Sequence, residues 1–318
     1  MKTVKACLGI LIVLSSALYI SFIGSDMETT DLDEHERKLL KADFVELKHG
    51  PVHYQLQGTE HTNTIVLVHG FSTPSYLWDR NVDALLAAGY RVLRFDLYGR
   101  GYSARPDLTY DIDLFVEQLD EITRALGIKQ AFHLAGLSMG GPITARFAHQ
   151  HPERVKSLSL LAPLVNTPES LDLTLIKLPY VGEYLASVVM MPKIENGIVR
   201  SAYDASTYPE WHKKMAQHIH YKGYRRALLS SARHLAGKLF TEDYRLLGDT
   251  GIPTQLIWGK EDRIINFEQS QILRTTLPEL RFHSLEKTGH LPQIEQAESV
   301  NTWLIEHLSR VDGSPINR

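Results

Sequence analysis

The chain has 318 residues, of which 43% are hydrophobic and 22% charged, so it is long enough to bury a large globular core. Its formal charge of −3, with no basic stripe along the sequence, gives no electrostatic case for nucleic-acid binding. The single cysteine, Cys7, lies near the N-terminus, which excludes disulfides, cysteine catalysis and cysteine-based zinc sites from the folded domain. The 15 histidines show no metal-ligand spacing, so we expect no cofactor or metal.

The N-terminal segment has two lysines within residues 1–5 and an almost entirely apolar run over residues 6–23. This pattern is typical of a signal peptide or signal anchor over residues 1–25, followed by an acidic, solvated linker over 26–42. Ser15-Ser16-Ala17 fits a cleavage site, yet the apolar run is nearly long enough to cross a bilayer, so an uncleaved anchor is favoured. Positive charge before the run predicts a folded domain that is exported or membrane-anchored on the extracytoplasmic side.

Strand and helix patterns alternate through most of the remaining chain. Apolar or alternating segments predict strands at residues 44–47, 53–57, 64–68, 91–95, 131–134, 155–161, 254–258 and 281–285. Helical spacing follows at residues 77–87, 112–126, 142–149, 267–277 and 300–308. The first two strands predict an antiparallel hairpin, and the repeated β-α units predict an α/β fold with a mostly parallel, eight-stranded sheet covered by helices on both faces.

The alternation stops between residues 166 and 248, where prolines interrupt helical patterns and no strand is evident. We therefore expect a helical cap over 166–248, inserted after the sixth strand. The α/β core would then comprise residues 43–165 and 249–310, and residues 311–318 would form a loose tail.

A nucleophile-elbow motif follows the fifth strand. Gly136-Leu137-Ser138-Met139-Gly140 fits the pattern G-x-S-x-G, and the required strand–turn–helix context is present. Such a turn strains the serine backbone and exposes its hydroxyl, while the flanking glycines let strand and helix approach closely. The motif alone would arise by chance roughly once in ten such chains. A base, an acid and an oxyanion hole elsewhere in the chain must therefore support it.

Two further residues follow the last strands. Asp262 comes just after the strand at 254–258, and His290 just after the strand at 281–285. In a doubly wound sheet, residues beyond the carboxyl ends of the strands gather at one edge. The chain order is therefore Ser138, Asp262, His290, which is the order of the triad in α/β-hydrolases.

With these residues the sequence resembles the α/β-hydrolase superfamily, within the branch that includes lipases, monoacylglycerol hydrolases and C–C hydrolases. The resemblance covers roughly residues 43–308 and includes His69-Gly70-Phe71 and the motif Asp96-x-x-Gly99-x-Gly101-x-Ser103. It implies that His69 braces the oxyanion loop and that Asp96 caps a turn. Relatives carry the acid at the second position of its loop, which favours Asp262 over the adjacent Glu261.

The chemistry of the residues predicts their roles. His290 would take the proton of Ser138, and Asp262 would hold the imidazole and stabilise its protonated form. The N–H groups of Phe71 and Met139 would bind the oxyanion. Superfamily members that resemble haloalkane dehalogenases and epoxide hydrolases carry an aspartate at the elbow. Ser138 therefore argues against both of these classes.

These features predict a serine carboxylester hydrolase acting on medium- to long-chain acyl esters. Cap segments 171–181 and 185–191 are very apolar: either they only pack the cap on the core, or they line an acyl-chain pocket and touch a membrane. The open alternatives are a C–C bond hydrolase of the meta-cleavage type, an acyl thioester or methyl-ester hydrolase, and a non-catalytic binding module. The expected partners are a small-molecule or lipid ester and, through the N-terminal segment, a membrane. The sequence leaves the natural substrate and the oligomeric state open.

Overall fold

Eight strands form a single sheet in the computed structural model, which describes residues 2–167 and 171–313. Their spatial order is β1-β2-β4-β3-β5-β6-β7-β8, with β1 and β2 antiparallel to their neighbours and all other pairs parallel. This confirms the predicted α/β architecture. The strands are β1 (Asp43–Leu47), β2 (Gly50–Gln57), β3 (Thr64–Val68), β4 (Arg91–Phe95), β5 (Phe132–Leu137), β6 (Val155–Leu161), β7 (Thr254–Gly259) and β8 (Arg281–Leu285).

The central strands are continuous apolar runs because both faces of the sheet are covered. Along β3, Val66 and Val68 enter one buried cluster, whereas Ile65 and Leu67 enter the cluster on the other face. Helices α3 (Asp79–Ala87) and α15 (Ala297–Asp312) contact each other and contribute to the cluster of Ile65. The other cluster is covered by α4 (Ile112–Ala125), α5 (Gly140–Gln150), α12 (Thr241–Asp249) and α13 (Ser270–Thr276).

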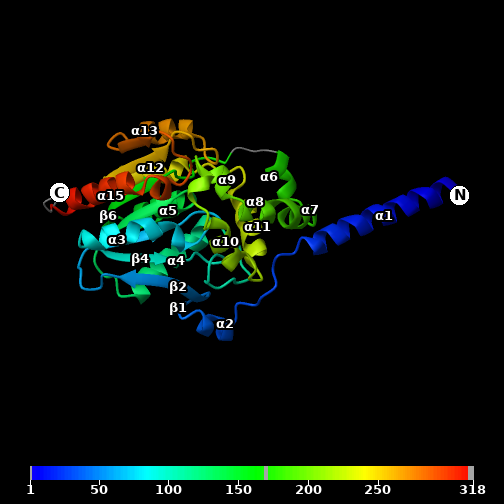
Figure 1. Cartoon of the computed structure of the whole chain (residues 1–318). Helices are drawn as coiled ribbons and strands as arrows, with labels where there is room; N and C mark the ends of the chain where they lie inside the picture. Colours follow the sequence, from blue (N-terminus) through cyan, green and yellow to red (C-terminus); the bar gives the residue numbers. More distant parts are fainter. Residues whose placement is uncertain (1, 168–170, 314–318) are drawn as a thin grey trace.

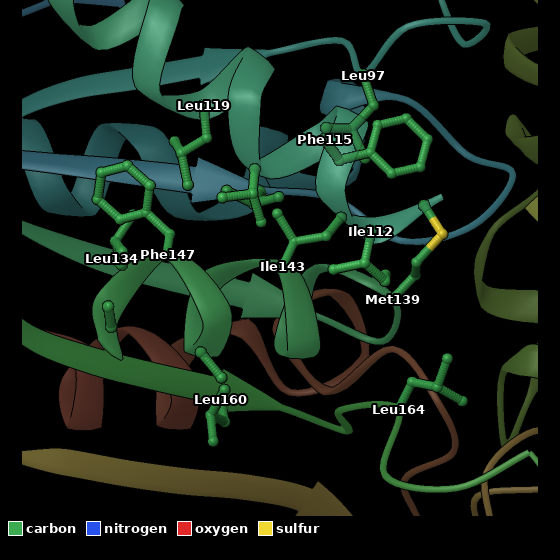
Figure 2. Packing of buried hydrophobic residues seen from close by; sticks show 14 of the residues in the cluster. Leu97, Ile112, Phe115, Leu119, Leu134, Met139, Ile143, Phe147, Leu160 and Leu164 are labelled. Atoms are coloured by element: carbon green, nitrogen blue, oxygen red, sulfur yellow. The ribbon is translucent and has the colours of Figure 1, made fainter. Parts of the chain in front are cut away.

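Figure 2 shows part of this second cluster, in which Ile143 and Phe147 of α5 lie beside Leu119 of α4 and Leu134 of β5. The side chain of Met139, at the start of α5, belongs to the same buried cluster. The turn that carries Ser138 is therefore fixed on a rigid part of the core.

A set of short helices follows β6 and lies on one side of the core, between the core and α1 (Lys2–Gly24) (Figure 1). These helices are α6 (Leu171–Ile176), α7 (Val181–Leu185), a π-helix at Ala186–Met190, α8 (Met191–Glu195), α9 (Ile198–Ser201), α10 (Trp211–Ile219) and α11 (Tyr224–Leu235). Helix α12, which falls within the predicted cap range, packs against α5 of the core. The predicted tail falls largely on residues 314–318, which lie outside the described residues.

The acidic segment after α1 is not a freely solvated linker, because it docks on the helices that follow β6. The N–H groups of Thr29 and Thr30 donate to the His220 carbonyl at 2.8 and 3.1 Å, and Lys222 N–H donates to Thr30 O at 2.9 Å. Glu28 accepts from the backbone N–H of Arg225 at 2.6 Å. Residues 34–39 then form the short helix α2 (Glu34–Leu39).

The structure corrects the predicted localisation. Within the residues that the structure describes, no helix combines the length and the apolar character needed to cross a membrane. The prediction of an exported or membrane-anchored domain on the extracytoplasmic side is therefore wrong, and the predicted attachment to a membrane through the N-terminal segment has no support from a spanning helix among the described residues. The end of α1 packs instead on the protein itself, where Arg225 lies 5.5 Å from the ring centroid of Phe22.

Candidate active site

Ser138 occupies a strained turn between β5 and α5. Its φ of +54° lies in the left-handed region, which non-glycine residues rarely adopt. Three backbone hydrogen bonds hold the turn: Ser138 N–H donates to Leu161 O at 3.0 Å, and its carbonyl accepts from Gly141 and Leu164 at 2.8 and 2.9 Å. Neighbouring structure thus supports a conformation that the chain would not adopt by itself.

Glycines surround this turn because no larger residue fits. A Cβ on Gly136 would lie 2.4 Å from Gly140 O, and a Cβ on Gly140 would lie 2.6 Å from Val68 O. On the facing loop, a Cβ on Gly70 would lie 3.1 Å from the Cβ of Ser138. The structure thus brings the loop containing His69 and Gly70 against the serine.

His290 and Asp262 meet at the carboxyl ends of the last two strands. Asp262 Oδ2 lies 2.8 Å from His290 Nδ1 and also accepts from Trp258 Nε1 at 3.0 Å. Its Oδ1 accepts from the backbone N–H groups of Ile264 and Ile265 at 2.8 and 3.0 Å. With both oxygens held, the carboxylate has one orientation and faces a histidine that is only 6% exposed.

The adjacent acid, Glu261, points elsewhere. Its carboxylate accepts from the backbone N–H of Thr288 at 3.0 Å, and its own N–H donates to Thr288 O at 3.0 Å. Glu261 therefore fastens the loop before His290, whereas Asp262 contacts the imidazole.

Ser138 and His290 line the same cavity. None of the hydrogen bonds among the described residues joins the Ser138 hydroxyl to the imidazole, and His290 Nδ1 is already occupied by Asp262. Nε2 is therefore the ring nitrogen left to face the serine. In unliganded hydrolases this contact is often long and shortens when substrate binds.

Two backbone N–H groups beside the serine have no acceptor among the described residues, those of Phe71 and Met139. Both residues line the cavity. The loop that carries Phe71 is braced by His69, whose Nε2 accepts from Leu97 N–H at 2.9 Å, so that Nδ1 carries the proton given to Gly70 O at 2.9 Å. Burial lowers the pKa of His69 to about 4, which keeps the brace neutral.

A buried arginine that sequence reasoning missed also holds the Phe71 loop. Arg100 Nε donates to Phe71 O at 2.8 Å, and one of its Nη groups donates to Ser231 of α11 at 2.8 Å. Burial lowers the pKa of Arg100 to about 10. Its position between the two glycines of the Asp96 motif was the available signal, but it did not reveal that Arg100 connects the loop to α11.

Asp96 stabilises the adjacent turn and lies apart from the His290–Asp262 pair. Its carboxylate accepts from Ser75 N–H at 2.9 Å and Tyr102 N–H at 3.0 Å, and it lies 2.7 Å from His53 Nδ1. Burial alone would raise the pKa of Asp96, but attraction to His53 and the hydrogen bond from its ring hold that pKa well below its usual range. Asp96 is thus an anchor for the loops on either side of it.

A cavity of about 680 Å³ opens above Ser138. The segment between β6 and α12 supplies most of the lining residues. The lining side chains are predominantly aliphatic or aromatic, including Leu173, Leu175, Ile176, Leu185, Val189, Met190, Ile194, Trp211 and Leu235. Within the part of the chain that the structure describes, no group of His, Cys, Asp or Glu side chains could hold a metal ion.

The fold and this site define an α/β hydrolase. The family model described as the alpha/beta hydrolase fold matches residues 63–297, so the chain belongs to that family.

Among characterised relatives, the chain is similar to a 2-hydroxy-6-oxononadienedioate/2-hydroxy-6-oxononatrienedioate hydrolase of Paraburkholderia phymatum. The two are 32% identical over 273 residues, covering 81% of this chain and 91% of the relative. Lipase 3 of a Moraxella species is 25% identical over 258 residues, covering 73% of this chain and 72% of the lipase. A solved thermophilic esterase from Thermogutta terrifontis has a TM-score of 0.72 and 25% identity, covering 85% of this chain and 99% of the esterase.

These relatives establish that the chain is a hydrolase, and they favour the C–C alternative over the ester prediction.

Proposed function

We propose that the chain is a serine hydrolase of carboxylic esters whose acyl group is a medium to long apolar chain. The observation that carries this proposal is the cavity of about 680 Å³ beside Ser138, whose wall is mostly aliphatic. Burying an alkyl chain there would contribute about 0.8 kcal/mol for each methylene group. Such a wall gives little binding energy to a short or strongly polar acyl group.

In the proposed reaction, His290 Nε2 takes the proton of the Ser138 hydroxyl as its oxygen attacks the ester carbonyl carbon. The carbonyl oxygen becomes negative, and the free N–H groups of Phe71 and Met139 stabilise it. His290 then gives the proton to the leaving alcohol, and the acyl group remains on Ser138. Water, deprotonated by His290, releases the acid by the same steps in reverse order. Asp262, 2.8 Å from His290 Nδ1, keeps the proton on that nitrogen throughout.

C–C bond hydrolysis is the second candidate, because the relative at 32% identity carries that activity in its name. The substrate in that name is a dioate, an anion with two carboxylates. The cavity offers two cationic side chains, Lys193 and Arg200, which are both exposed, and its remaining wall is mainly apolar. The two cations can pair with one anionic group, but the mainly apolar remainder of the described lining gives no partner for a second carboxylate, which supports the ester over the dioate. An acyl thioester would fit the same wall, and the hydrolase family counts against a purely non-catalytic module.

Substrate profiling of the wild type against Ser138→Ala tests the proposal. We expect fluorophosphonate labelling of the wild type and none of Ser138→Ala. Along a series of p-nitrophenyl esters, kcat/KM should rise from acetate to octanoate, because each added methylene is buried in the apolar wall. A preference for acetate would refute the acyl-chain proposal. Faster turnover of 2-hydroxy-6-oxononadienedioate than of every ester would establish the second candidate instead.

A further inference from the structure

The active-site cavity has an uneven distribution of charge. Lys193 of α8 and Arg200 of α9 are the only lysine or arginine side chains among its described lining residues, which include no aspartate or glutamate. Both are cationic and exposed, which places them at the solvent side of the cavity. Neither takes part in an ion pair or a side-chain hydrogen bond with another described residue. Two unpaired cations at the mouth of an apolar cavity attract an anion whose attached chain enters the cavity.

The two cations are set among apolar lining residues. Helices α6, α7 and α11 contribute Leu175, Leu185 and Leu235, and α8, which carries Lys193, also contributes Ile194. The cavity therefore combines an apolar wall with two cationic side chains. This arrangement matches an amphiphile better than a uniformly apolar ester.

Helix α9, which carries Arg200, adjoins the loop of His290. The residue after Arg200, Ser201, accepts the backbone N–H of His290 at 2.6 Å through its carbonyl. A Cβ on Gly289 would lie 2.4 Å from the same carbonyl, so the two backbones are in direct contact. Because His290 would protonate the leaving group, Arg200 of α9 lies next to the loop from which that group would receive its proton.

We propose that Lys193 and Arg200 form an anion subsite for the leaving-group side of the substrate. The substrate class is thus an apolar acyl chain esterified to an alcohol that carries a phosphate or a carboxylate. The inference rests on the proposed function for the identity of the leaving group, but binding of an alkyl anion can be measured without any turnover. Charge-assisted hydrogen bonds from arginine and lysine suit both anions, and arginine can grip either one through two N–H groups.

Protection of Ser138 from fluorophosphonate labelling tests the subsite. The probes are octyl phosphate, octanoate and octanol, which share a chain and differ in charge. We expect octyl phosphate to protect the wild type at roughly one-tenth of the octanol concentration, since hydrogen bonds to charged groups are worth about a factor of ten or more. In the double variant Lys193→Gln/Arg200→Gln, protection is measured relative to that variant's own labelling rate without ligand. The advantage of octyl phosphate over octanol should then fall below about twofold. Protection by octanoate as well as octyl phosphate assigns a general anion site, and protection by octyl phosphate alone assigns a phosphate site.

Lys213→Gln is the matched control, because Lys213 is an exposed cation on α10 that does not line the cavity. Octyl phosphate should keep its advantage in this variant. The inference is overturned if octanol protects the wild type as well as both anions, or if Lys213→Gln loses as much as the double variant. Arg200→Lys, which keeps the charge, should retain most of the advantage, and thermal unfolding reports whether each variant folds. If the wild type is not labelled at all, the proposed function fails, and calorimetric titration with octyl phosphate then decides the subsite separately.

Discussion

Replacing Asp262 by asparagine changes one atom of the site and has a calculable consequence. Four N–H donors converge on the Asp262 carboxylate, two on each oxygen. An asparagine has one oxygen, so its NH₂ group must face one of these pairs. The backbone N–H groups of Ile264 and Ile265 cannot change protonation, so the amide oxygen stays with them and the NH₂ group turns toward Trp258 and His290.

Only His290 can relieve that conflict, by moving its proton from Nδ1 to Nε2. An imidazole with its proton on Nε2 cannot accept the proton of Ser138. The corresponding substitution in the serine-protease triad lowers turnover by about 10⁴-fold, or about 5 kcal/mol of barrier, and we expect a loss of that order. The Trp258 N–H then faces an NH₂ group and has no acceptor. A buried donor left without an acceptor costs about 1–3 kcal/mol of folding stability.

The assay is the kcat of p-nitrophenyl octanoate hydrolysis by Asp262→Asn and Glu261→Gln, with urea unfolding of both. Glu261→Gln should change kcat less than about twofold, because a glutamine oxygen can still accept from Thr288 N–H. A large loss in Glu261→Gln together with a small one in Asp262→Asn would refute the assignment of the acid.

Two further predictions concern the supporting structure. Arg100→Met removes the donors to Phe71 O and Ser231 Oγ, so we expect about 2–4 kcal/mol less unfolding free energy and roughly tenfold lower kcat; an unchanged kcat would show that Arg100 does not position the oxyanion loop. Burial lowers the pKa of His133 to about 4. Between about pH 6.5 and pH 4 the unfolded chain therefore takes up a proton at this residue that the folded protein does not. The free energy of unfolding decreases as the pH falls through this range. His133→Gln, which keeps hydrogen-bonding capacity and cannot titrate, should lessen this acid destabilisation by up to about 3 kcal/mol at pH 4 in urea unfolding, and identical pH profiles would contradict the buried neutral histidine.

Much of the core could be predicted from local sequence. Each of the eight strands lies at or close to its predicted segment, because apolar runs covered on both faces leave few alternatives. The elbow was equally predictable, since a positive φ at Ser138 with no room for a Cβ at Gly136 and Gly140 requires the G-x-S-x-G pattern. These features depend on neighbours within a few residues.

The region after β6 was less predictable. Its short helices have no regular spacing, and their path over the core depends on contacts with distant segments. One such segment is the acidic stretch at residues 26–36, whose docking on His220 and Lys222 uses backbone groups that no sequence pattern reveals. Arg100 was missed for the same reason, because its partners lie 29 and 131 residues away.

The fold, the strained serine turn and the order of Ser138, Asp262 and His290 can be read from the sequence, because they follow from hydrophobic periodicity and from loops at the ends of parallel strands. The folded structure was needed to show that Asp262 rather than Glu261 faces the imidazole, since adjacent residues point in different directions and the choice depends on N–H donors from Trp258 and Ile264. It also decided the shape and charge of the cavity, which is assembled from helices far apart in the chain. Hydrophobic burial fixes the scaffold locally, whereas specificity depends on side chains that only folding brings together.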